Sequence, residues 1–275
     1  MQYSNFHTHT TYSDGKNSVR ENIEAAIASS MSALGFSDHS YTDFDSRYCI
    51  KKDDLPRYIE EIRRLGREYS DRIEIYLGYE LDGFAKLENR ELYDYIIGDV
   101  HYVRTHTGLR DVDMSRDEFI DVTNTCFGGD SIAFAKEYYS VYAECIPQMR
   151  PDILGHIDLV TKFGLVDEDD RRYRSYAIEA LETALAVCPV IEMNTGAISR
   201  GYRKTPYPAP FLLKEIKERG GKIILSSDSH RATDLTCAFD DCLEILRACG
   251  IGSVVAFKGG KLEEFGISAR SVSSI

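Results

Sequence analysis

Short apolar runs alternate with amphipathic patterns along almost the whole chain. The apolar runs predict strands at residues 3–9, 32–37, 73–77, 95–100, 152–155, 190–193, 222–226 and 253–257. Between these runs, apolar residues recur at helical spacing, which predicts helices that begin near residues 18, 54, 131, 173, 208 and 240. The stretch from 102 to 130 is less regular, and we expect only a short helix after Ser115 there. This alternation favours an α/β fold with mainly parallel strands.

Residues that can bind metals lie at the ends of most of the predicted strands. His7 and His9 are two positions apart, so a strand would point both imidazoles to one face. Such a pair supplies only half of a metal site, and a solvent-exposed strand would also explain it. The complete set of candidate ligands is His7, His9, Asp14, His39, Glu80, His101, His156, Asp228 and His230. Six of the seven histidines belong to this set, and only His106 does not.

The carboxyl ends of parallel strands converge on one face of a barrel, where active sites also lie. We therefore expect the candidate ligands to gather there, although they are far apart in the sequence. Imidazoles and carboxylates together favour Zn, Mn or Fe over Ca or Mg. Nine groups exceed the three or four that one catalytic zinc takes from a protein. The set therefore indicates two or three divalent ions, with Glu80 and Asp228 as bridging ligands.

Small and acidic residues flank several of the candidate ligands. Gly78, Gly98 and Gly155 come shortly before Glu80, His101 and His156, and we expect these glycines to leave room for ions. The acidic residues next to or near ligands are Asp38, Asp99 and Asp158. They are predicted to orient imidazoles as hydrogen-bond acceptors, although ordinary loop carboxylates would look the same in the sequence.

The composition of the chain disfavours a membrane protein, a disulfide-rich secreted protein and a nucleic-acid-binding protein. The 275 residues are 43% hydrophobic and 11% aromatic, which is typical of a globular protein. No apolar run approaches the roughly 20 residues of a membrane span, and no signal-peptide pattern opens the chain, so we expect a cytoplasmic protein. Seven scattered cysteines do not resemble a disulfide framework. The net charge of −12 disfavours nucleic acid as a partner, so an anionic substrate should be small.

The candidate ligands lie in short motifs that follow one another in a fixed order. The motifs are His7-Thr8-His9 with Ser13-Asp14, Asp38-His39-Ser40, Gly78-Tyr79-Glu80, Gly98-Asp99-Val100-His101, Gly155-His156-Ile157-Asp158 and Ser227-Asp228-Ser229-His230. Together they resemble the motifs of the polymerase and histidinol phosphatase (PHP) superfamily, from residue 3 to about residue 235. The chain length and the stretches 112–115 and 127–130 are similar to those of its monofunctional histidinol-phosphate phosphatases. Asp14 is also typical of them, where some other relatives have a histidine.

The resemblance implies one barrel domain over residues 1–275, with an insert at about residues 102–130. The expected fold is an α/β fold, a distorted (β/α)7 barrel with a trinuclear metal site at the C-terminal ends of the strands. Carried over by position, the first ion would be held by His7, His9, Glu80 and Asp228, the second by Glu80, His101 and His156, and the third by Asp14, His39 and His230.

The resemblance also implies an activity, the hydrolysis of L-histidinol phosphate to L-histidinol and phosphate in histidine biosynthesis. The expected nucleophile is a hydroxide that bridges two ions, because metal coordination lowers the pKa of water from 15.7 toward about 7. Arg200 and Lys162 are the expected ligands of the phosphate, and Arg203 and Lys204 are weaker candidates.

The leaving alcohol sets further requirements. Asp228 or His230 would help to protonate the departing alkoxide. Histidinol carries an ammonium group and an imidazole, which we expect Asp111, Asp113 and Tyr102 to bind.

Two other interpretations of the function remain open, a phosphoesterase for nucleotides or other small phosphomonoesters and a non-catalytic metal-binding module. A monomer and a homodimer are both compatible with the sequence.

Overall fold

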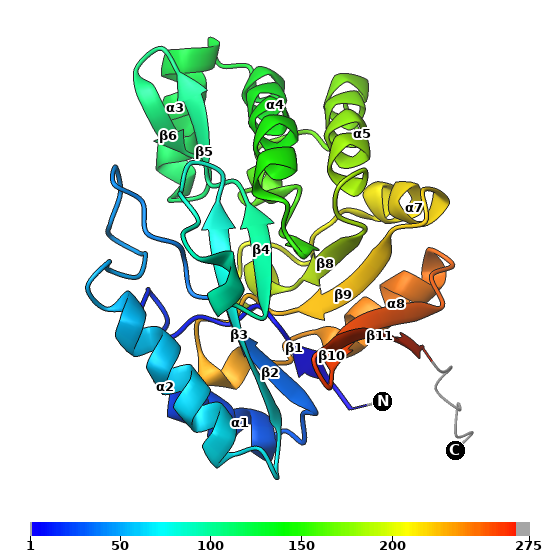
Figure 1. The fold of residues 1–275 in the computed structure, drawn as a ribbon. Helices are drawn as coiled ribbons and strands as arrows, with labels where there is room; N and C mark the ends of the chain where they lie inside the picture. The colour runs from blue at the N-terminus through cyan, green and yellow to red at the C-terminus, as the bar shows by residue number, and fades with distance from the viewer. Residues whose placement is uncertain (1, 268–275) are drawn as a thin grey trace.

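The computed structural model describes residues 2–267. Seven parallel strands form its central sheet (Figure 1). In sheet order these strands are β1 (Ser4–Asn5), β2 (Ala33–Phe36), β3 (Glu74–Asp82), β4 (Tyr95–Asp99), β7 (Ile153–Leu154), β8 (Val190–Asn194) and β9 (Lys222–Ser226). The segments after β1 and β9 are joined by a parallel bridge between Thr8 and Ser229, in which the Ser229 N–H donates to the His7 carbonyl over 3.1 Å. The predicted α/β barrel is therefore confirmed.

A hairpin distorts the barrel beside β9. It consists of β10 (Ser253–Lys258), which is parallel to β9, and β11 (Lys261–Gly266), which is antiparallel to β10. The strand at β10 was predicted, whereas β11 was not. Most residues of β11 are exposed, so the strand lacks the alternation of apolar and polar positions that marks a half-buried strand.

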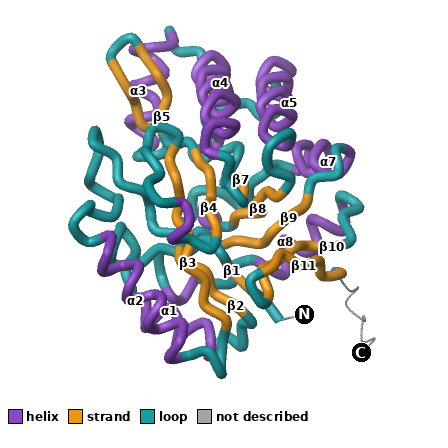
Figure 2. The backbone as a smooth tube through the Cα atoms, viewed as in Figure 1, coloured by secondary structure: helices purple, strands orange, loops and turns teal. Residues whose placement is uncertain are grey.

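Helices surround the strands, as Figure 2 shows. The longer ones are α1 (Val19–Ala28), α2 (Leu55–Glu68), α4 (Ser131–Met149), α5 (Arg171–Leu185), α7 (Pro210–Glu218) and α8 (Phe239–Ala248). Short helical segments are α6 (Gly196–Ser199), η1 (Arg90–Leu92), η2 (Leu159–Thr161) and η3 (Ala232–Asp234). α1 begins at the predicted capping box, in which the side chains of Ser18 and Glu21 each accept a hydrogen bond from the other residue's backbone N–H. Within residues 2–267, no helix combines the length and the apolar character needed to cross a membrane.

Residues 102–130 contain more regular structure than the sequence pattern predicts. β5 (Tyr102–Thr105) and β6 (Gly108–Asp111) form an antiparallel hairpin, and α3 (Arg116–Phe127) follows it. The expectation of a short helix alone was wrong, because two strands of four residues are too short to show a clear alternation. Ser115 caps α3 as predicted, by accepting a hydrogen bond from the Glu118 N–H. That this stretch is an insert in a single domain stays a prediction.

A buried tyrosine fills the interior of the barrel. Tyr95 on β4 is fully buried, and its hydroxyl donates a 2.6 Å hydrogen bond to the carbonyl of Phe6. A Cβ atom at Gly78 would lie 2.2 Å from Cζ of this ring, and one at Gly35 would lie 2.3 Å from its hydroxyl oxygen. The expectation that Gly78 leaves room for ions was therefore wrong, because the residue leaves room for Tyr95.

Replacing Gly78 by alanine tests this packing. Gly78→Ala should lower the free energy of unfolding by about 1–3 kcal/mol, because the added methyl group overpacks the Tyr95 ring. Gly66→Ala in α2 is the matched control, since its Cβ would approach other atoms no closer than 3.5 Å and alanine favours a helix. Urea unfolding followed by circular dichroism measures both changes. A Gly78→Ala variant as stable as the wild type would contradict the packing described here.

Candidate metal centre

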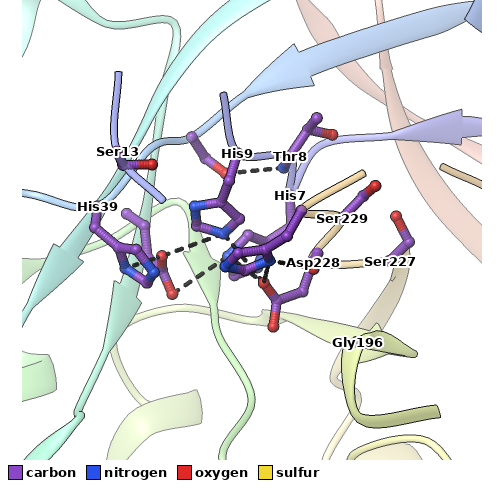
Figure 3. A network of polar contacts seen from close by, with 12 residues as sticks. His7, Thr8, His9, Ser13, His39, Gly196, Ser227, Asp228 and Ser229 are labelled. Carbon is purple, nitrogen blue, oxygen red and sulfur yellow. Dashed lines mark hydrogen bonds and ion pairs between the residues drawn. The ribbon is translucent and has the colours of Figure 1, made fainter. Parts of the chain in front are cut away.

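The candidate ligands come together at the carboxyl ends of the strands. Figure 3 shows His7, His9, His39 and Asp228 facing one another there. A cavity of about 200 Å³ opens beside them. Six of the nine predicted ligands line this cavity, namely Asp14, His39, His101, His156, Asp228 and His230. His7, His9 and Glu80 lie deeper and are buried.

Glu80, on β3, lies at the middle of the cluster and is 1% exposed. Its carboxylate oxygens lie within 3.6 Å of a ring nitrogen of each of five histidines: His7 (3.2 Å), His9 (3.6 Å), His39 (2.6 Å), His101 (3.5 Å) and His156 (3.4 Å). Burial acts to raise the pKa of this carboxyl group, but the positive charges of His39 and His7 outweigh burial and hold the pKa well below its usual value. An ionised carboxylate with nitrogens beside both oxygens has the geometry of a bridging ligand.

A second group of ligands lies on the solvent side of His9. Asp14 Oδ2 lies 3.0 Å from His230 Nε2, and Asp14 Oδ1 lies 3.8 Å from His39 Nε2. Burial and the neighbouring charges of His230 and His39 lower the pKa of His9 to about 3. The imidazole of His9 is therefore neutral at pH 7, which is the form that binds a metal.

Asp228 connects the last strand of the barrel to this cluster. Its Oδ1 atom lies 3.1 Å from His9 Nε2 and 3.7 Å from His7 Nε2. Its φ of +46° places the backbone in the left-handed region, which non-glycine residues rarely adopt. Such strain is typical of functional sites, where neighbouring contacts hold a side chain in position.

Four sets of donor atoms lie close enough together to hold an ion, and Glu80 belongs to three of them. The sets are His7, His9 and Glu80; His39, Glu80 and His101; Glu80, Asp99 and His156; and His9, Asp14, His39 and His230. These sets contain eight of the nine predicted ligands together with Asp99, and the ninth, Asp228, lies 3.1 Å from His9. The structure places His39 beside both Glu80 and Asp14, whereas the expected partition placed His39 only with Asp14 and His230.

The donor atoms satisfy a test for metal binding that does not depend on the family. Among the described residues, His7 Nε2, His9 Nδ1 and both carboxylate oxygens of Glu80 are buried without a hydrogen-bond partner. Buried polar atoms are nearly always paired, so a set of unpaired atoms that face one another requires an explanation. Imidazole and carboxylate donors in this arrangement fit divalent metal ions.

Buried carboxylates orient several of the imidazoles. Asp99 Oδ1 lies 3.1 Å from His156 Nδ1, a close contact that lacks the geometry of the predicted hydrogen bond. Gly155 leaves space for Asp99, because a Cβ at this position would lie 1.8 Å from Asp99 Oδ1. The expectation that Gly155 leaves room for ions was therefore wrong. The other two predicted acceptors bond elsewhere, since Asp38 accepts from Thr10 and Ser13, and Asp158 accepts from the Ala209 N–H.

Two orienting carboxylates were missed in the sequence. Asp82 Oδ2 lies 3.3 Å from His101 Nδ1, and Glu192 Oε2 lies 2.9 Å from His7 Nδ1. Both carry a signal that could have identified them. Asp82 follows Glu80 by two positions on one strand, so the two side chains share a face. Glu192 is a charged residue inside the apolar run at 190–193, where an unpaired charge would be costly.

Arg200 and Lys162, the two side chains expected to bind phosphate, both line the cavity. Arg200 donates to the Asp228 carboxylate over 2.9 Å, and its Nη1 atom lies 2.9 Å from His230 Nδ1. Lys162 forms a 2.7 Å ion pair with Asp113, which also lines the cavity. Arg200 and Lys162 therefore lie next to metal-ligand candidates rather than in free solvent.

Three other predicted residues lie outside the cavity lining. Arg203 donates to the Thr161 carbonyl over 3.0 Å and pairs with Glu168. The Tyr102 hydroxyl donates to Tyr48, whose ring lines the cavity beside His39. Lys204 is exposed. Tyr48 could not be identified from the sequence, because a tyrosine in a polar loop gives no signal by itself.

Asp111 and Asp113 both line the cavity, but they differ in charge state. Burial acts to raise the pKa of Asp113, yet the charge of Lys162 outweighs burial and lowers it below the usual range. Burial and the nearby charge of Asp113 raise the pKa of Asp111 to about 7. Asp111 Oδ1 accepts hydrogen bonds from the backbone N–H groups of Asp113 and Met114, both over 2.7 Å.

A parallel barrel with imidazoles and carboxylates at its strand ends defines a class of metal-binding α/β proteins. The chain belongs to the PHP domain family, whose model matches residues 5–196. The predicted family is therefore confirmed. A protein of Deinococcus radiodurans described as a probable histidinol-phosphatase is 31% identical over 89% of this chain and 92% of its own length. The histidinol-phosphatase of Bacillus subtilis is 27% identical over 89% of this chain and 99% of its own length.

A solved structure has the same fold. The histidinol phosphate phosphatase of Lactococcus lactis, complexed with zinc, L-histidinol and phosphate, superposes with a TM-score of 0.73. The match covers 95% of this chain and 99% of that chain, at 22% sequence identity. The distorted barrel is thus shared with an enzyme of this family.

Thermal melting tests whether the cluster binds metal. Zn²⁺ added to chelator-treated protein should raise the Tm by several degrees, because a ligand at about one hundred times its Kd stabilises the folded state by about 2.7 kcal/mol. Mg²⁺ at the same concentration should raise it less, since imidazoles favour Zn²⁺. His9→Ala should reduce the zinc effect, whereas His106→Ala, at an exposed histidine outside the cluster, should retain it. An equal response to both metals would contradict this assignment.

Proposed function

We propose that the chain is a metal-dependent phosphomonoesterase that hydrolyses L-histidinol phosphate to L-histidinol and phosphate, a reaction of histidine biosynthesis. The observation that carries the proposal is the cluster of nine imidazoles and carboxylates beside a cavity that also contains Arg200 and Lys162. The relatives from D. radiodurans and B. subtilis support this substrate, as does the complex of the L. lactis enzyme with histidinol and phosphate.

The proposed cofactors are two or three divalent ions, with zinc favoured and manganese or iron as alternatives. Their proposed ligands are His7, His9, Asp14, His39, Glu80, His101, His156, Asp228 and His230. When bound, such ions lower the pKa of water toward neutrality and offset the negative charge of the phosphoryl group. Glu80 is the proposed shared ligand, because it faces five imidazoles.

Arg200 and Lys162 are the proposed phosphate-binding residues. The guanidinium of Arg200 presents a planar fork that matches phosphate oxygens, and Lys162 adds a compact charge on another wall of the cavity. Tyr102 and Arg203 act from behind the cavity lining, where Tyr102 holds Tyr48 and Arg203 holds Thr161 next to Lys162.

We propose that Asp228, one of the two predicted proton donors, does not protonate the leaving alkoxide. Burial acts to raise the pKa of Asp228, but the charges of Arg200 and His7 outweigh burial and keep the pKa well below its usual value. Asp228 is therefore ionised at neutral pH and has no proton to donate. His230, the other predicted donor, lines the same cavity, where its Nε2 atom lies 3.0 Å from Asp14 Oδ2 and its Nδ1 atom lies 2.9 Å from Arg200 Nη1.

Asp111 is the proposed partner of the histidinol ammonium group. Asp113 is already paired with Lys162, whereas no ion pair involves Asp111 within residues 2–267. A pKa near 7 allows Asp111 to ionise fully when a cation binds beside it. Asp113 then acts on the phosphate side, by holding Lys162 in the cavity. A cytoplasmic location and a monomeric or homodimeric state remain predictions.

The proposed activity is tested by phosphate release from histidinol phosphate with Zn²⁺ or Mn²⁺, before and after chelation. Release that stops on chelation and resumes when metal is restored is the expected result. Comparable turnover of nucleoside monophosphates would favour the broader phosphoesterase, which the net charge of −12 and the small cavity disfavour. No turnover by the fully metallated protein would favour a metal-binding module instead.

His9→Ala should lower turnover of histidinol phosphate by more than about 100-fold, which exceeds the typical cost of losing only an outer contact to a metal ligand. The fold should remain, because the barrel does not depend on this imidazole. Circular dichroism and steady-state kinetics measure the two quantities, and His106→Ala should leave both unchanged. Retained turnover in His9→Ala would mean that the first strand does not take part in the chemistry.

Asp111→Asn should raise KM for histidinol phosphate by roughly 10-fold or more, since a charge-assisted hydrogen bond contributes about 1.5–3 kcal/mol. KM for p-nitrophenyl phosphate, which lacks the ammonium group, should not change. Asp113→Asn is the matched comparison and should impair both substrates, because it frees Lys162. Equal effects of Asp111→Asn on the two substrates would contradict its assigned role.

A further inference from the structure

One buried carboxylate links several strands below the metal centre. Glu192 lies on β8 and is 1% exposed. Its Oε2 atom accepts from His7 Nδ1 over 2.9 Å and from the Ser226 hydroxyl over 2.5 Å. Its Oε1 atom accepts from the His156 backbone N–H over 2.7 Å and from the Asn194 side-chain amide over 2.8 Å. Both oxygens are therefore fully used, and their partners follow β1 and β7 or lie on β8 and β9.

The bond to His7 fixes which ring nitrogen can bind a metal. A carboxylate can only accept, so Nδ1 of His7 keeps its proton and Nε2 is the nitrogen that would give its lone pair to a metal ion. Nε2 points at Glu80 over 3.2 Å. Glu192 therefore selects both the tautomer and the ring orientation that direct His7 into the cluster.

The bond from the His156 backbone fixes a ligand of another donor set. His7 belongs to the set with His9 and Glu80, whereas His156 belongs to the set with Glu80 and Asp99. Asp82 gives a contrast, because its carboxylate reaches one candidate ligand, His101, through both the ring and the backbone N–H.

We infer that Glu192 is a positioning residue that fixes ligands of two different metal positions with one carboxylate, so that the affinities of both positions depend on it. The inference rests on the proposed metal centre and goes further, by naming the residue that couples two of its positions. It concerns the arrangement of the ligands, and Glu192 is not assigned any contact with substrate.

Stepwise zinc titration of chelator-stripped protein against a chromophoric competitor tests this inference. Glu192→Ala removes both acceptor oxygens, so neither His7 nor His156 keeps its contact with this residue. Two binding steps should weaken, each by about 10–100-fold, which is the usual cost of losing such an outer contact. Asp82→Ala, which removes the matched buried carboxylate, should weaken one step. A Glu192→Ala variant that weakens a single step, or none, would overturn the inference.

Measurements on the metal-free protein distinguish a role of Glu192 in positioning the ligands from a role in folding alone. Far-UV circular dichroism of chelator-stripped Glu192→Ala should match the wild type while the two zinc affinities fall. If this variant does not fold, Ser226→Ala replaces it, because this change removes one donor to Oε2 and leaves the contacts of Oε1 in place. One zinc step should then weaken, and unchanged affinities in every step would overturn the inference. Zinc binding by a wild-type chain that does not hydrolyse histidinol phosphate would refute the proposed function and leave this inference intact.

Discussion

The structure depends on the burial of one carboxylate, Glu80, among five imidazoles. A lone ionised carboxylate at this depth would be unstable, so it requires several positive or metal-bound partners. The five histidines follow the ends of separate strands. These strands must therefore end at the same depth for the imidazoles to reach the carboxylate. The closure of the barrel through Thr8 and Ser229 meets this requirement, because it brings the first and last strands of the cluster together.

The layers around Glu80 follow from the same constraint. Below it, the fully buried Tyr95 ring packs against Gly35 and Gly78. Around it, Asp82, Asp99 and Glu192 each lie beside the other ring nitrogen of an imidazole. Above it, the cavity carries Arg200 and Lys162. A site that combines buried ligands with basic groups at an open face suits the hydrolysis of a small anionic ester.

Much of the barrel and the ligand set could be predicted, because strand ends and metal-binding residue types are local features of the sequence. Nine candidate ligands were identified in this way, and the structure places their side chains in one cluster. Glu192 and Asp82 were missed because their role depends on which strands become neighbours. The role of Gly78 was misjudged for the same reason, since Tyr95 lies 17 positions away. Contacts between distant segments carry information that no single stretch of sequence contains.

The central claim is that these residues form one polynuclear metal centre around Glu80. The most direct test is anomalous X-ray diffraction at the zinc edge from crystals of the zinc-loaded protein, with metal analysis of the same sample. The account predicts two or three zinc peaks within bonding distance of the nine ligands, with Glu80 shared between two of them. A single peak, or peaks that do not involve Glu80, would contradict it.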